Sequence, residues 1–417
     1  MVRIEWKSGR ASLRAASLAI LFCVVSAAAP AAWAQSGTIT FTLAGQSMLR
    51  SDMRETSPAE VPVVQELLKG GDVTFTNLEA AVAEPGQTVH EGRGFLTPPE
   101  AVDALKVFGI NLLSLAGNHA FDLHETGIRN TLNAVERVNI VHAGTGNNVS
   151  EATAPGYLHT PKGTIALIAS ASGLIAPGGS ATASRPGVNE LRVEAGGREN
   201  ESTQDLPPGV PNTPNPEDAQ RILQSIRDAR QHADYVVVYQ HNHVFANHSF
   251  ATIFTEEMPE RMAPNEWLVK WVHAEIDAGA DIVVMHGSPM LHGVEIYHGR
   301  PIFYDLGNFI YNLPFPITYI DEPINWESAV ATVQFEGKNL RSVSFRPIFL
   351  NTIGEGQPDA HSEYTSNQFL QTRGLPKAAT GARAGYILQR LADLSKPFGT
   401  VMDINGDTAE IELKATH

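Results

Sequence analysis

The stretch that decides the fold lies at residues 110–122, which read INLLSLAGNHAFD. Residues 110–116 are an apolar run of the length of a buried strand, and the run stops at Gly117-Asn118-His119, with Asp122 close behind. Asparagine, histidine and aspartate are residue types that bind metal ions or transfer protons. This segment therefore predicts a buried strand that carries a chemically active group of side chains at its end.

Four other apolar runs end in the same way, each in a polar residue suited to metal binding or acid–base chemistry. They are residues 38–44 (TITFTLA) before Gln46, 72–76 (DVTFT) before Glu79, 235–239 (YVVVY) before His241, and 282–285 (IVVM) before His286. Ligands of open α/β sheets gather at the carboxyl ends of the strands. We therefore expect the five endings to converge on one rim.

Segments with helical spacing alternate with these strands, at 58–69, 98–109, 127–138 and 266–278. Several strands are continuously apolar, which is typical of strands buried on both faces. The pattern predicts an α/β fold with helices covering the sheets.

The first 34 residues have the pattern of a secretory signal. A basic stretch precedes an apolar run at 18–29, and Ala32-Trp33-Ala34 then gives a small-x-small cleavage site. We expect cleavage after Ala34, a periplasmic or secreted product, and no stable membrane anchor. The single cysteine, Cys23, lies in this segment, so an exported chain has no thiolate for catalysis or metal binding.

The remaining chain is expected to form one domain over residues 35–350, with 351–417 as a C-terminal extension that packs on it. Residues 173–216 are rich in Gly, Ser, Pro and Asn and read as a long loop or lid within that domain. The formal charge of −15 disfavours nucleic-acid partners, because it would repel phosphates.

Several polar residues also have a purely structural interpretation. His119 could cap the helix that follows it. His243 and His248 read as loop residues without a function, and His298 as a solvated turn residue. The pair Trp267 and Trp271, four apart on one helix, reads as core.

Taken together, the motifs resemble the CapA group of capsule and poly-γ-glutamate synthesis proteins, which is similar to a branch of the calcineurin-like metallophosphoesterase superfamily. The resemblance rests on an ordered set spread over nearly all of the chain after the signal: residues 45–50 (GQSMLR), 77–79 (NLE), 114–122 (SLAGNHAFD), 233–241 (ADYVVVYQH), 279–286 (GADIVVMH) and 295–310 (EIYHGRPIFYDLGNFI).

This resemblance implies a four-layer α-β-β-α sandwich with one or two divalent metals at the strand ends. The family's ligands map onto Asn118, His119, His241 and His286, with Glu79 as an additional acidic ligand. Imidazole and carboxylate groups suit Mn, Zn or Fe.

Two positions depart from the family pattern. The first strand of the family ends in Gly-Asp, where this chain has Gln46, a poor ligand. The later Gly-His-His-Pro-His motif aligns with Met285-His286-Gly287-Ser288-Pro289, so its last histidine is replaced by Pro289. The loss of one anion and one imidazole disfavours a two-metal phosphatase, and leaves either one metal or none.

Two functions follow from this resemblance. The first is an exported enzyme that acts on a carboxylate- or amide-containing substrate, small or polymeric, by hydrolysis or by metal-independent acid–base chemistry such as a lyase or epimerase step. The second is a non-catalytic assembly or binding component of capsule or poly-γ-glutamate synthesis. The candidate catalytic residues are His119, His286, Asp122 and Gln46, the candidate substrate-binding residues Arg185, Arg192 and His292, and the candidate metal ligands Glu79, Asn118, His241 and His286.

Overall fold

The computed structural model describes residues 37–89, 94–195, 198–199, 212–244, 263–312, 323–351 and 373–413. Residues 36–417 form one compact unit by their contacts. The predicted signal (1–34) and His248 lie outside the described residues, as do parts of the predicted lid and of the C-terminal extension. Among the described helices, none has the length and apolar character needed to cross a membrane.

The larger sheet is mixed and has β1 near its centre. The strand order is β22 (Met402–Asn405), β23 (Thr408–Ile411), β20 (Asn339–Leu350), β19 (Glu327–Glu336), β1 (Thr38–Met48), β2 (Val73–Leu78), β5 (Leu112–Ser114) and β6 (Val141–Ala143), with β18 (Asn308–Tyr311) paired to β1 and β21 (Pro376–Ala378) to β20. The pairs from β1 through β6 are parallel, so their carboxyl ends meet on one edge.

The smaller sheet has six strands, in the order β16 (Val294–Tyr297), β17 (Arg300–Phe303), β15 (Ile282–His286), β14 (Tyr235–Asn242), β9 (Gly163–Ser172) and β8 (Gly156–Thr160). β16 and β17 form an antiparallel hairpin that turns at His298-Gly299, and both turn residues have positive φ, 49° and 73°.

The core lies between the two sheets. The Phe41 ring of β1 meets that of Tyr235 on β14 with centroids 5.6 Å apart, and Phe75 of β2 meets Tyr239 at the same separation. The two sheets are therefore packed face to face, and the carboxyl ends of β2 and β14 can reach one another across the interface.

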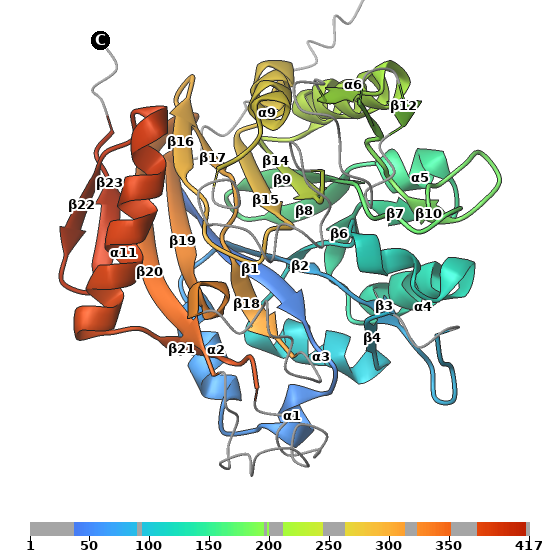
Figure 1. Ribbon diagram of the computed structural model, residues 1–417, viewed down its shortest axis with the longest axis horizontal. Coiled ribbons are helices and arrows are strands. Elements are labelled where there is room, and N and C mark those ends of the chain that lie inside the picture. The colour runs from blue at the N-terminus through green and yellow to red at the C-terminus, as the bar shows by residue number, and fades with distance from the viewer. Residues whose placement is uncertain are drawn as a thin grey trace, which may run out of the picture. The chain divides into compact units, whose positions relative to one another are not determined.

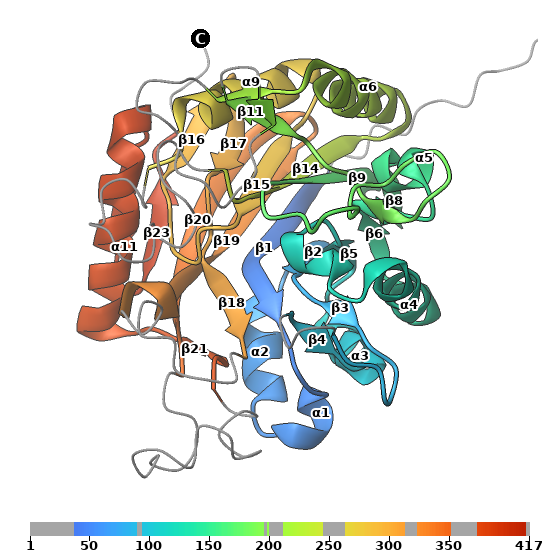
Figure 2. The ribbon, with the colours of Figure 1, turned by 45° about the vertical axis from the view of Figure 1, so that its right-hand side comes forward.

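Helices cover the sheets. α6 (Pro216–His232) and α9 (Glu266–Ala278) lie across β14 and β15 (Figure 2), where Ile226 and Trp271 pack with Val238 in a second buried cluster. The prediction that Trp267 and Trp271 are core residues is confirmed, because both are buried. α2 (Val61–Leu68), α3 (Pro99–Phe108) and α4 (His124–Arg137) pack with the larger sheet, and α11 (Gly381–Ser395) lies along β20 and β23 (Figure 1).

The remaining elements are short. They are α1 (Met53–Thr56), α5 (Val149–Thr153), β3 (Ala81–Val82), β4 (Leu96–Thr97), β7 (Thr145–Gly146), β10 (Gly187–Val188), β11 (Val193–Ala195), β12 (Arg198–Glu199), β13 (Asn212–Pro214) and the 3-10 turns η2 (Asn118–Phe121), η3 (Pro323–Trp326) and η5 (Lys396–Phe398). The predicted α/β class is confirmed.

Four strands run further than the apolar pattern predicts. β1 continues to Met48 rather than residue 44, β2 to Leu78 rather than 76, β14 to Asn242 rather than 239, and β15 to His286 rather than 285. Neighbouring strands supply the backbone partners there: Gln46 pairs with Asn77 and Asn308, and His241 with His286. Several polar site residues therefore stand on rigid strands rather than on loops.

Candidate functional site

Glu79 is a candidate ligand contributed by the larger sheet. It follows β2 directly, and its backbone N–H donates to the Ser47 carbonyl at 3.1 Å, which fixes the chain at that point. Its side chain is buried, and burial raises the pKa of Glu79 to about 7, with a smaller lowering by His119 and a raising by Asp122. Burial outweighs the effect of His119, so the ionised carboxylate is costly in this position and would be stabilised by a bound cation.

His241 is a candidate ligand contributed by β14 of the smaller sheet. Its Nε2 atom lies 3.0 Å from Oδ1 of Asn118 and 3.8 Å from Oε1 of Glu79, while its Nδ1 atom lies 3.1 Å from the Tyr239 hydroxyl. Burial, and then the charge of His119, lower the pKa of His241 to about 3. The ring is therefore neutral at physiological pH, which is the form that binds metals.

His243 completes a triad with these two residues. Ligand atoms of Glu79, His241 and His243 all lie within 4.8 Å of one another, and all three side chains are buried. Burial also lowers the pKa of His243 well below its ordinary value. The loop position predicted for His243 is correct, since it directly follows β14, but the prediction that it has no function overlooked its place beside two candidate ligands. The usable signal was the His-x-His spacing, because residues two apart at a strand end point to the same side.

His286 lies next to this triad without belonging to the same group of atoms. It pairs with His241 across β14 and β15, and its ring centroid is 5.5 Å from that of Tyr239. Neither ring nitrogen has a hydrogen-bond partner in the part of the chain that the structure describes. Burial lowers the pKa of His286 well below its usual range. The structure thus offers a third neutral imidazole beside the two of the triad.

The ligand types of the triad and the unpaired oxygen of Glu79 both suit a divalent metal. One carboxylate and two neutral imidazoles form a set that Zn²⁺, Mn²⁺ or Fe²⁺ accepts. The Oε2 atom of Glu79 has no hydrogen-bond partner among the described residues. The residues therefore fit one such metal, with Asn118 as the neutral oxygen closest to His241. Glu79, Asn118 and His241, predicted as ligands, do come together.

Gln46, predicted as a candidate catalytic residue, lies in a row of amide side chains. Its Nε2 donates to Oδ1 of Asn308 at 2.7 Å, and its strand partner on the other side is Asn77. This row crosses β2, β1 and β18 and carries no charge. Gln46 and its two strand partners are all neutral amides. This row therefore offers no anionic ligand to a second cation.

His119 and Asp122 form a second group at the rim. Nδ1 of His119 lies 2.7 Å from Oδ2 of Asp122, and the same oxygen accepts the Phe95 N–H at 2.5 Å. Burial acts to lower the pKa of His119, but the hydrogen bond and charge of Asp122 raise it overall. A histidine held in this way by a carboxylate can carry a proton at its other nitrogen.

His292 and Asp305 line a small buried cavity next to His286. The cavity is also bordered by Asn242, Ser288 and Tyr304. The His292 N–H donates to the Asp305 carbonyl at 3.0 Å, and the Gly307 N–H donates to Oδ1 of Asp305 at 2.7 Å. Burial raises the pKa of Asp305 well above its ordinary value. His292 therefore stands close to the site, as its predicted role requires, and that role stays a prediction.

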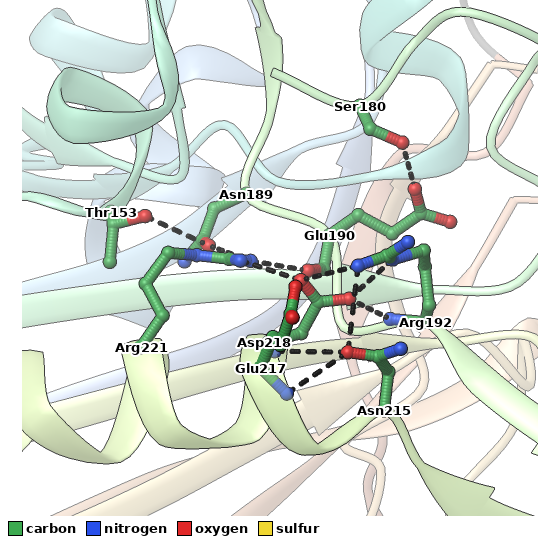
Figure 3. Close-up of polar contacts among 9 residues, drawn as sticks. All are labelled: Thr153, Ser180, Asn189, Glu190, Arg192, Asn215, Glu217, Asp218 and Arg221. Atoms are coloured by element: carbon green, nitrogen blue, oxygen red, sulfur yellow. Dashed lines mark hydrogen bonds and ion pairs between the residues drawn. The ribbon is translucent and has the colours of Figure 1, made fainter. Parts of the chain in front are cut away.

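Arg192 lies in a polar network around the start of α6 (Figure 3). Arg192 Nε donates to Oδ2 of Asp218 at 2.7 Å, and Arg221 Nη1 donates to the other oxygen at 2.5 Å. Arg185 Nη2 donates to the Ser180 carbonyl at 3.3 Å. Asp218 thus engages Arg192 in an ion pair, and the substrate-binding role of both arginines stays a prediction.

The comparisons with known proteins agree with these motifs. Residues 40–313 match the family described as "Bacterial capsule synthesis protein PGA_cap". An uncharacterized protein of Sinorhizobium fredii is 29% identical over 84% of this chain and 88% of its own length. The capsule biosynthesis protein CapA of Bacillus anthracis is 25% identical over 69% of this chain, and the match spans 63% of that relative.

Among solved structures, a hypothetical protein from Thermus thermophilus aligns with a TM-score of 0.40 and 13% identity, over 74% of this chain and 98% of the other. The family match covers well over half of the sequence and includes every member of the triad. The chain therefore belongs to the bacterial capsule synthesis (PGA_cap, CapA-like) family of the metallophosphoesterase-like superfamily.

Proposed function

We propose that this protein is an exported, single-metal hydrolase that cleaves an amide bond in a carboxylate-bearing substrate such as γ-linked glutamate. The observation that carries this proposal is the buried triad of Glu79, His241 and His243, whose ligand atoms lie within 4.8 Å of one another beside the His119–Asp122 pair. The name of the Bacillus anthracis relative, a capsule biosynthesis protein, supports the substrate class.

Each residue has a distinct task in this proposal. Glu79, His241 and His243 hold the metal, and Tyr239 orients the His241 ring through its Nδ1 atom. A divalent ion held there would supply Lewis-acid chemistry, lowering the pKa of water and polarising the scissile carbonyl. His119, fixed by Asp122, delivers a proton to the leaving amine nitrogen, which would otherwise leave as an unstable anion.

A second candidate function is supported by the amide row. Gln46 stands where the family carries an aspartate, and its neighbours Asn77 and Asn308 are also neutral. A pocket that has lost half of its metal machinery suits a protein that binds or presents an anionic polymer without cleaving it. In that case the triad has a structural role only.

Metal content and hydrolysis separate the two functions. Protein comprising residues 35–417 is loaded with Zn²⁺, Mn²⁺ or Fe²⁺, analysed for bound metal, and assayed on poly-γ-glutamate and on γ-glutamyl amides. We expect one tightly bound equivalent and measurable cleavage. Glu79→Gln, His241→Ala and His243→Ala should each weaken metal binding at least about 10-fold and abolish cleavage.

The matched control is His159→Ala, because His159 is an exposed histidine whose ring contacts Thr164 on the β8–β9 hairpin. This variant should keep both metal and activity. Metal binding with no cleavage of any amide would favour the binding function. Wild-type cleavage by all three triad variants would overturn the proposed metal centre.

A further inference from the structure

Arg50 is held rigidly two residues beyond the end of β1. Its Nε atom donates to the Asn312 carbonyl at 3.1 Å, and its guanidinium lies over the Phe95 ring with 4.2 Å between Cζ and the ring centroid. One edge of the guanidinium is thus tied to the backbone and one face is covered by an aromatic ring. Such a fixed arginine presents its remaining N–H groups in one direction.

Arg50 has no carboxylate partner within the described part of the chain. Other partly buried arginines of this protein do have one: Arg192 and Arg221 pair with Asp218, and Arg230 and Arg300 pair with Asp281. Burial lowers the pKa of Arg50 to about 10, and no neighbouring carboxylate offsets it. A desolvated cation without a counterion is unfavourable on its own, and it becomes favourable when an anion binds.

Phe95 connects this cation to the candidate active site. The Phe95 ring centroid lies 6.2 Å from that of His119, and the Phe95 N–H donates to the carboxylate that holds His119. On the other side, Ser47, three residues before Arg50, accepts the N–H of Glu79. Arg50 therefore lies at the same rim as the triad and the His119–Asp122 pair.

We propose that Arg50 binds a carboxylate group of the substrate and thereby places the neighbouring amide bond at the triad. The proposal rests on the function proposed above and adds the residue that selects the substrate. A carboxylate suits this position better than a phosphate dianion, because Arg50 is a single cation that can neutralise only one negative charge. The carboxylate of Asp122, which holds His119 and accepts the Phe95 N–H, would repel a second negative charge.

The test compares a carboxylate substrate with an analogue that has no carboxylate. The probes are γ-glutamyl-glutamate and the same dipeptide with all of its carboxylates, both α and the free γ, converted to carboxamides, assayed with metal-loaded wild type, Arg50→Gln and Arg50→Lys. We expect Arg50→Gln to lower kcat/KM for the carboxylate about 10- to 100-fold, mainly through KM, and to leave the carboxamide within about 2-fold. Arg50→Lys should fall between, because it keeps the charge but loses the planar fork.

The matched control is Arg129→Gln, which removes an exposed arginine of α4 that pairs with Glu125. Metal content and melting temperature are measured for every variant, so that a misfolded Arg50→Gln is recognised and Arg50→Lys then decides. An equal loss on both probes, or none on either, would overturn the carboxylate role, as would tighter binding of inorganic phosphate than of the dipeptide.

Equilibrium binding keeps this result separate from the function proposed above. Calorimetric titration of the metal-loaded protein with the dipeptide needs no turnover. If no amide is cleaved but Arg50→Gln weakens dipeptide binding at least 10-fold, the hydrolase fails and the Arg50 site stands. If cleavage occurs and Arg50→Gln does not change the affinity for the dipeptide, the hydrolase stands and the Arg50 site fails.

Discussion

The Nδ1 atom of His119 and the Oδ2 atom of Asp122 lie 2.7 Å apart, one turn from each other in the segment that follows β5. Because Asp122 raises the pKa of His119 against the opposing effect of burial, Asp122→Asn should lower that pKa. A titration of the His119 ring by NMR checks this shift. Cleavage should also fall roughly 100-fold or more if His119 is the proton donor.

The same pair predicts a pH dependence of stability. The folded pKa of His119 lies above the reference value of 6.5, so the pair's stabilisation is fully present below about pH 6.5 and is lost as the pH rises through the folded pKa. Wild type should therefore exceed Asp122→Asn in free energy of unfolding by more at pH 5.5 than at pH 9. An equal difference at both pH values would contradict the assignment.

Glu275 on α9 predicts a second pH dependence, away from the triad. This side chain is fully buried, and burial raises its pKa to about 8, with a weaker opposite effect of Trp271. The folded chain holds the proton where the unfolded chain has lost it, so stability decreases as the pH rises from about 4.5 to about 8. Glu275→Gln should raise stability at pH 8.5 by several kcal/mol and change it much less at pH 4.5. Urea unfolding at the two pH values measures this.

Asp218 should anchor the loop around Arg192 to α6. Burial acts to raise the pKa of Asp218, but Arg192 and Arg221 lower it overall, so its stabilisation is present at neutral pH and lost as the pH falls through its folded pKa. Asp218→Asn should cost about 1–3 kcal/mol at pH 7, because it leaves two partly buried cations without a partner. Chemical denaturation at pH 7 and pH 3 gives the comparison, and a cost that grows at pH 3 would contradict it.

Two glycines should respond to alanine in opposite directions. Gly287 has φ of 134°, and a Cβ there would overlap the carbonyl oxygen of Asn242. Gly287→Ala should therefore cost about 3 kcal/mol or more and weaken metal binding, since β14 and β15 must move apart. Gly385, inside α11, has no atom near its Cβ position, and Gly385→Ala should stabilise by about 0.5–1 kcal/mol. Thermal unfolding of both variants decides the matter.

The strand endings were the part of the site that the sequence could predict. Buried strands and polar endings both follow from local composition, and they brought Glu79, Asn118 and His241 together as expected. The sequence did not identify His243, because residue type alone does not show that a side chain just after a strand is buried. That burial results from the packing around the end of β14. The engagement of Arg192 by Asp218 was equally invisible, since these residues are 26 positions apart.

The surroundings of Arg50 also could not be predicted from the sequence. The sequence places it after a strand, but only the fold shows that no acid of the described segments pairs with it and that Phe95 covers one face. An absent partner is a property of the whole packing, so no local pattern can reveal it. The same is true of the row formed by Gln46, Asn77 and Asn308, which needs the register of three strands.

The backbone at Gly287 restricts which residues this position can carry. In the resembling family a histidine stands at this position, yet here the left-handed conformation and the nearby Asn242 carbonyl leave no space for a side chain. Any side chain at this position, histidine included, would push apart β14 and β15, which pair His241 with His286. The spacing of these two imidazoles therefore depends on a residue that has no side chain of its own.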